Sequence, residues 1–256
     1  MSRTPTAIAP PPSEGGEEKA IPILTRWFGS WRVSLHRRAL NSVELKAAYD
    51  CEAPGWSRTL EFLRMQCAYK SALRKVLYRE RVVFGAHCCR VLDCGVGDGA
   101  FSAAFAEVNS LPINVDAVDL SPQMLALAGQ RLRDLDVKVE LHLTDSQCLP
   151  FDDNAFDIIL TAHMLEHLAD PQAALREMTR VLKPGGLLIA CVTRQSLLGR
   201  YIQAKWRTHA VTRQQAEEWF RSQELQGVFS LSNAGHEIFD RMSIVCVGRK
   251  PFRARI

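Results

Sequence analysis

The chain has 256 residues, of which 47% are hydrophobic and 23% charged, and its formal net charge is +4. These values are typical of a globular chain that can bury a core, and they exclude a mostly disordered protein. The apolar runs are far shorter than the roughly 20 residues of a membrane-spanning helix, so a single-pass membrane protein is excluded too. The length fits one α/β domain with an added lid or cap better than two full domains.

The first 20 residues are rich in Pro, Gly, Glu and Ser and show no periodicity. Such a composition cannot bury enough apolar surface to fold, so we expect a disordered tail over residues 1–25. The stretch lacks the apolar core of a signal peptide, and its glutamates argue against a transit peptide. No two of the eight cysteines have the C-x-x-C spacing. Together these features predict a cytoplasmic protein with reduced thiols, without disulfides or a metal ion.

A helical pattern of apolar residues runs from about residue 35 to 84, interrupted at Pro54-Gly55. This pattern predicts an N-terminal helical lid over residues 26–89. Tyr49, Trp56 and Tyr69 belong either to the core of this lid or to a surface that covers a ligand.

From Arg90 onward, short apolar runs alternate with helical segments of 10–15 residues. This alternation predicts an α/β domain over residues 90–256 with a doubly wound, mostly parallel, Rossmann-like sheet. The final apolar runs, 227–231 and 243–248, predict a terminal antiparallel hairpin. A cap at about 194–226 would be inserted before it. The strands are expected at 91–93, 115–120, 137–143, 156–161 and 187–193, and the helices from Gly99, Pro122, Pro171 and Thr212.

The charges are distributed unevenly along the chain. Residues 26–90 hold 13 Lys/Arg against 5 Asp/Glu, a net +8, and residues 194–256 hold 11 against 5, a net +6. Residues 91–193 hold 6 against 15, a net −9. The acidic central block therefore favours a cationic ligand over a phosphate, with basic segments on either side.

A glycine-rich turn follows the first strand of the α/β domain in the run Val91-Leu92-Asp93-Cys94-Gly95-Val96-Gly97-Asp98-Gly99-Ala100-Phe101. Its spacing also satisfies the dinucleotide fingerprint, with Asp119 about 20 residues further on. The carboxylate of Asp93, at the end of the strand, would repel a pyrophosphate and attract a ligand with ammonium and sulfonium groups. An NAD-dependent oxidoreductase is therefore disfavoured.

This run resembles motif I of the class I S-adenosylmethionine-dependent methyltransferases. The resemblance extends through Ala117–Leu125, Asp145–Asp157, Leu165–Leu168 and Leu182–Gly186, in the order typical of small-molecule methyltransferases of the ubiquinone/menaquinone-biosynthesis type. It covers roughly residues 90–193, about 40% of the chain. Ala117 departs from the pattern, because the family often has glycine there.

The resemblance implies S-adenosylmethionine as cofactor, S-adenosylhomocysteine as product, and a set of cofactor contacts at the strand ends. The implied contacts are Asp93, Gly95 and Gly97 to the methionine part, Gly99 for close helix packing, Asp119 to the ribose, Leu120 and Met124 on either side of adenine, Asp145 and Ser146 to its amino group, and Ala162 and His163 beside the sulfonium.

The methyl acceptor is expected to be a small molecule. A general base is needed only if the acceptor keeps its proton at neutral pH. His163 is the first candidate, as a base or to position the acceptor, with Tyr49 and His36 behind it. His167 fits a packing or capping role better than that of a base. Cationic side chains of the predicted cap could recognise a carboxylate or phosphate on the acceptor. They are Arg194, Arg200, Lys205 and Arg207.

Two alternatives stay open from the sequence. One is a nucleic-acid or protein methyltransferase on the same fold, with the basic segments as its docking surface. Nucleic acid is disfavoured, because these segments contain no dense basic run and because Thr161-Ala162-His163-Met164 stands where amino-group methylases of nucleic acids carry an Asn/Asp-Pro-Pro-Tyr-type segment. The other is a pseudoenzyme that only binds the cofactor. The methylated atom and the oligomeric state, a homodimer included, are left open.

Overall fold

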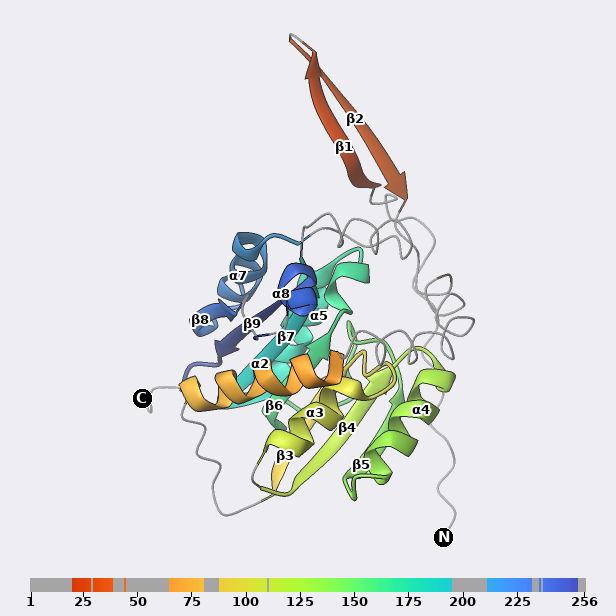
Figure 1. Cartoon of the computed structure of the whole chain (residues 1–256), viewed down its shortest axis with the longest axis vertical. Coiled ribbons are helices and arrows are strands. Elements are labelled where there is room, and N and C mark those ends of the chain that lie inside the picture. Colours follow the sequence, from red (N-terminus) through yellow and green to blue (C-terminus); the bar gives the residue numbers. More distant parts are fainter. Residues whose placement is uncertain are drawn as a thin grey trace. The chain divides into compact units, whose positions relative to one another are not determined.

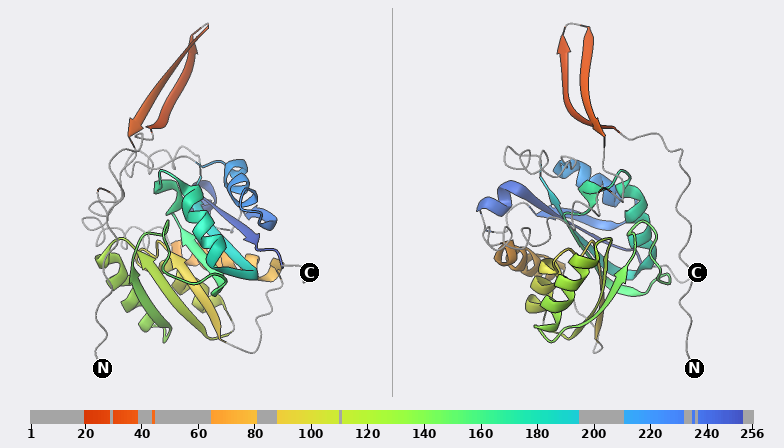
Figure 2. Two further views of the ribbon diagram at one scale, coloured as in Figure 1. Left: turned by 180° about the vertical axis from the view of Figure 1, so that it is seen from behind. Right: turned by 90° about the vertical axis from the view of Figure 1, so that its right-hand side faces the viewer.

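A computed structural model describes residues 20–28, 30–38, 44, 65–80, 88–109, 111–194, 211–231, 235 and 237–252 (Figures 1 and 2). The chain divides into two compact units, residues 1–39 and 40–256. Several residues singled out in the sequence lie outside the described ones, namely Tyr49, Trp56, Arg200, Lys205 and Arg207.

The first unit contains a β-hairpin formed by β1 (Ala20–Phe28) and β2 (Trp31–Arg38). The strands are antiparallel, from the pair Ala20↔Arg38 to the pair Phe28↔Trp31. This corrects the sequence interpretation, which placed residues 20–25 in a disordered tail and residues 26–38 in a helical lid. Ile21, Ile23, Thr25 and Trp27 alternate with period two before a Gly-Ser dipeptide, which is the pattern of a hairpin rather than of a helix.

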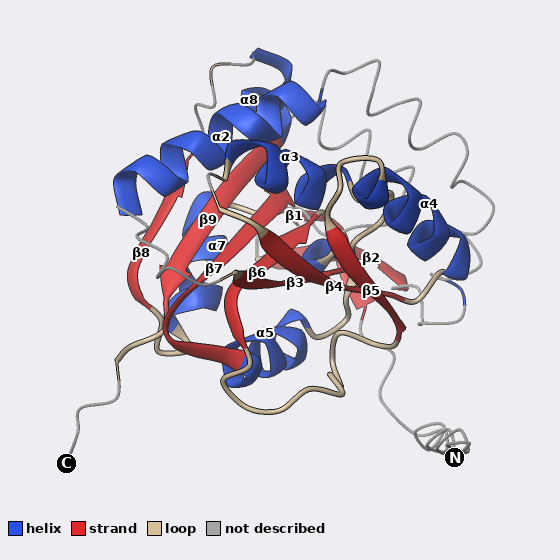
Figure 3. Ribbon diagram, turned by 90° about the horizontal axis from the view of Figure 1, so that it is seen from below, coloured by secondary structure: helices blue, strands red, loops and turns tan. Residues whose placement is uncertain are grey.

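The second unit is built on a seven-stranded sheet in the order β5-β4-β3-β6-β7-β9-β8 (Figure 3). Its first five strands in that order are parallel, and β9 runs antiparallel to both β7 and β8. The predicted doubly wound sheet with a terminal antiparallel hairpin is therefore confirmed. The strands are β3 (Cys89–Cys94), β4 (Ile113–Asp119), β5 (Lys138–Leu143), β6 (Phe156–Ala162), β7 (Leu182–Thr193), β8 (Gln226–Leu231) and β9 (Ser243–Arg249).

Helices cover both faces of the sheet (Figure 3). One face packs against α2 (Met65–Glu80), α3 (Ala100–Val108), α4 (Pro122–Arg133) and α8 (Glu237–Met242), and the other against α5 (Pro171–Val181) and α7 (Arg213–Arg221). Side chains alternate between two cores, because Val91 faces the first helical layer and Leu92 the second. None of the described helices has the length and hydropathy needed to cross a bilayer.

The helix starts follow signals that are visible in the sequence. Ser121 caps α4 by accepting a hydrogen bond from the backbone N–H of Met124 at 3.2 Å, and Asp170 caps α5 through Gln172 at 3.1 Å. Each cap precedes a proline at the first helical position, where the missing N–H costs nothing. These short caps fix where the loops after β4 and β6 turn into helices.

Helix α2 is the part of the predicted lid that the structure describes as helical over several turns. It buries Tyr69, Leu73 and Val76 in the core, and Lys70 forms an ion pair with Glu107 of α3. The helix thus packs firmly against the sheet domain through α3. A lid that opens and closes over a ligand stays a prediction, as does the cap at about 194–226.

Gly99 provides a test of how tightly α3 and α4 must approach. Its φ of +80° lies in the left-handed region, and a Cβ built there would be 2.9 Å from Cα of Ala128 in α4. We expect Gly99→Ala to lower the free energy of unfolding by about 2–4 kcal/mol, because backbone strain and overpacking add. Gly227→Ala is the control: its φ is +59°, but nothing lies within 4 Å of its Cβ, so about 1 kcal/mol is expected. Equal losses in urea denaturation would contradict the packing argument.

Candidate cofactor-binding site

An open pocket lies at the carboxyl ends of β3, β4, β5 and β6. This edge is where open α/β sheets bind ligands. Most residues predicted to contact a cofactor line the pocket: Gly95, Gly97, Asp119, Leu120, Asp145, Ser146, Ala162 and His163. Asp93, Gly99 and Met124 do not line it. Met124 is fully buried, and its place beside adenine stays a prediction.

The backbone of the glycine-rich turn is held by the protein itself. Gly95 and Val96 both donate their N–H to the carbonyl of Val118, and Gly97 donates to Oδ2 of Asp119 at 3.0 Å. The N–H of Gly99 bonds to Val96, and that of Ala100 to Oδ1 of Asp98. Phosphate-binding turns need such N–H groups pointing at the ligand. Here these donors are already used, so the turn is unsuited to a pyrophosphate.

Asp119 connects the two segments that form one side of the pocket. Its Oδ2 accepts from Gly97 in the turn after β3, and its Oδ1 accepts from the N–H of Ser121 at 2.9 Å. The side chain is therefore fixed at the point where β4 ends. Each carboxylate oxygen has a second lone pair, so Asp119 can still accept hydrogen bonds from a pair of hydroxyl groups.

Asp93 is buried at the end of β3, with 1% of its surface exposed. Ser102 of α3 donates to its Oδ2 at 2.6 Å, while its Oδ1 has no hydrogen-bond partner among the described residues. Burial raises the pKa of Asp93 to about 7, and the nearby carboxylates of Asp119 and Asp98 add to this effect against the Ser102 hydrogen bond. A buried, unpartnered carboxylate oxygen is the feature that a cationic ligand group would satisfy.

Asp98, in contrast, is occupied within the fold. Arg131 of α4 pairs with its Oδ2 at 2.8 Å and also donates to its backbone carbonyl. Oδ1 of Asp98 accepts a hydrogen bond from the backbone N–H of Ala100, the first residue of α3. Asp98 therefore anchors the glycine-rich turn between two helices, and its charge is already compensated.

His163 follows β6 with a φ of +54°, a conformation that is rare for residues other than glycine. Its Nδ1 lies 3.2 Å from Oε1 of Glu166 and 3.0 Å from the hydroxyl of Thr193, and its Nε2 lies 3.5 Å from Sγ of Cys191. Its backbone N–H donates to the carbonyl of Cys191 at 2.7 Å. Both ring nitrogens are thus engaged by the protein.

The pair of His163 and Glu166 favours its charged form. Burial opposes the charge on His163, but Cys191 and Glu166 outweigh it and raise the pKa of His163 to about 10. Burial likewise opposes the charge on Glu166, but the hydrogen bond and positive charge of His163 lower the pKa of Glu166 to about 2. An imidazolium with both nitrogens occupied cannot take a proton from an acceptor. These contacts argue against His163 as a general base and favour a positioning role.

Tyr69 of α2 lies beside this pair. Its ring centroid is 6.4 Å from that of His163 and 5.0 Å from that of Phe101. Burial, followed by neighbouring negative groups, raises the pKa of Tyr69 well above its usual value, so the phenol stays protonated. Helix α2 therefore brings a neutral aromatic residue next to the site, as the sequence left open.

Among the residues predicted to bind the acceptor, only Arg194 belongs to the part of the chain that the structure describes. Its Nη1 donates to the backbone carbonyl of Asp240 at 3.2 Å, and it does not line the pocket. Its role in acceptor binding stays a prediction.

Several pocket residues were not predicted as ligand contacts: Val118, Ser121, Thr144, Met164, His167 and Leu168. Met164 shows why they were missed. A Cβ on Gly95 would lie 2.5 Å from Cγ of Met164. The side chain of Met164, in the loop after β6, therefore fits only because a glycine stands in a turn some 70 residues earlier. No local pattern contains such a contact. Ser121 and Thr144 could have been found, because each directly follows a predicted strand.

Comparison with known proteins agrees with the motifs. Residues 92–190 match the family model described as a methyltransferase domain. A demethylmenaquinone methyltransferase of Clavibacter sepedonicus is 39% identical over 102 residues, which cover 40% of this chain and 40% of that protein. A ubiquinone/menaquinone biosynthesis C-methyltransferase of Shewanella woodyi is 38% identical over 102 residues, which cover 39% and 41%. The chain spans about two-fifths of the length of the curated relatives it matches.

The fold is shared with solved methyltransferases. A SAM-dependent methyltransferase of Thermotoga maritima superposes with a TM-score of 0.61 at 20% identity, covering 80% of this chain and 99% of that one. The fold that the motifs implied is thereby confirmed. The similarity in sequence is confined to the segment that builds the pocket, whereas the similarity in fold extends further.

Replacing Glu166 tests the charged pair. Glu166→Gln should lower the free energy of unfolding by about 3–5 kcal/mol at pH 6, because it leaves His163 buried without its counter-charge. Glu237→Gln is the control, since its ion pair with Arg241 is exposed and should contribute less than about 1 kcal/mol.

The pH dependence has a definite sign. The depressed pKa of Glu166 stabilises the fold above its usual 4.5, and this is lost as pH falls toward 2. The raised pKa of His163 stabilises it below the usual 6.5, and this is lost as pH rises toward 10. NMR of the imidazole nitrogens should find His163 protonated at pH 8. Titration of His163 near 6.5 in the wild type would refute the pairing.

Proposed function

We propose that the protein is an S-adenosylmethionine-dependent methyltransferase with a small-molecule acceptor. The observation that carries this proposal is the set of carboxylates at the ends of three neighbouring strands, Asp93, Asp119 and Asp145. They surround a glycine-rich turn in which the N–H groups of all three glycines are already bonded. This arrangement disfavours a pyrophosphate and suits a ligand with hydroxyl, amino and cationic groups. The methyltransferase-domain match over residues 92–190 supports the same reaction class.

The described residues fit this cofactor in three places. The unpartnered Oδ1 of Asp93 would receive the ammonium of the methionine part. Asp119, already fixed by two N–H groups, would receive the ribose hydroxyls. Asp145 and Ser146 would face adenine from the loop after β5. When bound, the cofactor supplies a methyl group on a positively charged sulfur.

The chain's own residues would serve mainly to align the acceptor and exclude water. Methyl transfer from a sulfonium is a displacement in line with the breaking bond, so alignment contributes most of the acceleration. The His163–Glu166 pair would fix the wall beside the reacting sulfur, and Tyr69 would close it from α2. An acceptor that must lose a proton would need another base, and Tyr49 remains the candidate.

We propose an acceptor that carries a carboxylate or phosphate, bound by the basic segments on either side of the acidic block. The net charges of +8 and +6 on those segments support it. A nucleic-acid or protein methyltransferase, or a pseudoenzyme that only binds the cofactor, are the alternatives. The relatives named as acting in quinone biosynthesis favour a small molecule. We place the reaction in the cytoplasm, because the eight cysteines suit a reducing compartment.

The raised pKa of Asp93 predicts a pH-dependent affinity. The ammonium of S-adenosylhomocysteine should bind the ionised carboxylate, whose pKa in the free protein is about 7. Affinity measured by calorimetry should therefore fall about tenfold between pH 7 and 5.5. Asp93→Asn should bind weakly and lose this dependence. A pH profile that is the same in both proteins would exclude contact between Asp93 and the ammonium.

A transfer assay tests the reaction itself. With methyl-labelled cofactor and a fractionated metabolite extract, the wild-type chain should transfer label to a small molecule. Asp119→Asn should cut this transfer at least tenfold. It removes the negative charge of a hydrogen-bond acceptor, and hydrogen bonds to charged groups contribute about 1.5–3 kcal/mol to binding. Transfer to protein or RNA instead would favour the first alternative, and cofactor binding without any transfer would favour the pseudoenzyme.

A further inference from the structure

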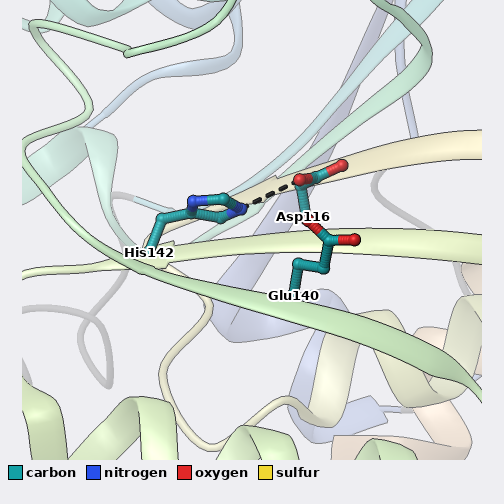
Figure 4. Close-up of side chains that lie close together, drawn as sticks. All are labelled: Asp116, Glu140 and His142. Atoms are coloured by element: carbon teal, nitrogen blue, oxygen red, sulfur yellow. Dashed lines mark hydrogen bonds and ion pairs between the residues drawn. The ribbon is translucent and has the colours of Figure 1, made fainter. Parts of the chain in front are cut away.

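A second cluster of chemically active side chains lies on β4 and β5, apart from the residues that line the pocket (Figure 4). Nε2 of His142 is 2.9 Å from Oδ1 of Asp116, and Glu140 completes the group. One ligand atom from each of the three residues lies within 4.8 Å of the others. Asp116 is buried to 5% exposure, whereas Glu140 is exposed.

The strand pairing explains why these side chains meet. Asp116 on β4 is the direct partner of Glu140 on β5, and His142 follows two residues later on the same face. Leu141, between them, points to the opposite face, where it contacts Gly129 of α4. The cluster is thus on the face of β5 that α4 does not cover, and the His142 side chain is 27% exposed.

Asp116 and Glu140 are paired on neighbouring parallel strands, and two carboxylates held close together repel. A cation between them removes this cost. We propose that Asp116, Glu140 and His142 bind a divalent transition-metal ion such as Zn²⁺, through one oxygen of each carboxylate and Nε2 of the imidazole. A mixed nitrogen and oxygen ligand set suits such ions better than Mg²⁺, which prefers oxygen alone.

The surroundings of the cluster support its use as a ligand set. Ligand atoms about 2.0–2.1 Å from a tetrahedral ion lie about 3.3 Å apart, so the 2.9 Å between His142 and Asp116 requires only a small adjustment. Nε of Arg90 contacts the other oxygen of Asp116 at 3.3 Å, which leaves Oδ1 for the ion and orients the carboxylate. The ring of Phe151 packs edge-on against the imidazole of His142, with 4.9 Å between the ring centroids, and helps to fix its orientation.

The ion would have a structural consequence for the pocket. β5 is at the edge of the sheet, and it leads within a few residues to Thr144, Asp145 and Ser146 in the pocket wall. Ligands on both strands would tie β5 to β4. Because such an ion binds only the folded chain, it should raise the thermal stability in proportion to its affinity.

The test uses the full chain after treatment with a chelator. Titration with Co²⁺ should produce the d–d absorption of nitrogen and oxygen ligands without a thiolate charge-transfer band, and Zn²⁺ should raise the melting temperature. His142→Gln and Glu140→Gln should each weaken Co²⁺ binding at least tenfold. Glu237→Gln, an exposed carboxylate elsewhere on the surface, is the control and should bind like the wild type.

The proposal would be overturned by an absence of Co²⁺ absorption, by a thiolate band showing that cysteines hold the ion, or by unchanged affinity in either ligand variant. Stabilisation by Mg²⁺ equal to that by Zn²⁺ would contradict it as well. Circular dichroism of the two variants without metal separates a lost ligand from a lost fold, because both substitutions keep the side-chain size close to the original.

Discussion

The rest of the pocket depends on the hydrogen bonds that the carboxylate of Asp119 accepts from the backbone. By accepting N–H groups from Gly97 and Ser121, it joins the turn after β3 to the start of α4. The carbonyl of Val118, one residue earlier, receives two further N–H groups of the same turn. The end of β4 thus shapes the glycine-rich turn from the side, and it does so with the donors that a phosphate ligand would otherwise require.

The buried carboxylates of this site differ in whether they have a positively charged partner. Where the protein needs a fixed carboxylate for its own architecture, it supplies a partner, as Arg131 does for Asp98 and His163 for Glu166. Asp93 accepts a single hydrogen bond, from the hydroxyl of Ser102, and its burial raises its pKa. This difference is the reason why we propose Asp93, and not Asp98 or Glu166, as a ligand contact.

Much of this could be predicted from the sequence, because the relevant signals are local. Strand ends, glycine spacing and the Ser121-Pro122 and Asp170-Pro171 caps specify where β4, α4 and α5 begin or end. The hairpin at residues 20–38 was missed because the composition of the preceding tail outweighed a period-two pattern nine residues long.

The contacts that decide the chemistry could not be predicted. The approach of Gly95 to Met164 and of His163 to Cys191 joins residues far apart in the chain, and no periodicity encodes it. The same is true of the occupation of both ring nitrogens of His163, which argues against a role as general base. The sequence identifies the residue types at the strand ends, and only the packing decides which of their atoms are available.

We propose that this pocket selects an S-adenosyl ligand with an amino-acid part over a dinucleotide. The most direct measurement compares the melting temperature of the full chain with S-adenosylhomocysteine and with NADH at equal concentrations. S-adenosylhomocysteine should raise the melting temperature, increasingly with concentration, while NADH should leave it unchanged. Stabilisation by NADH and none by S-adenosylhomocysteine would contradict the account.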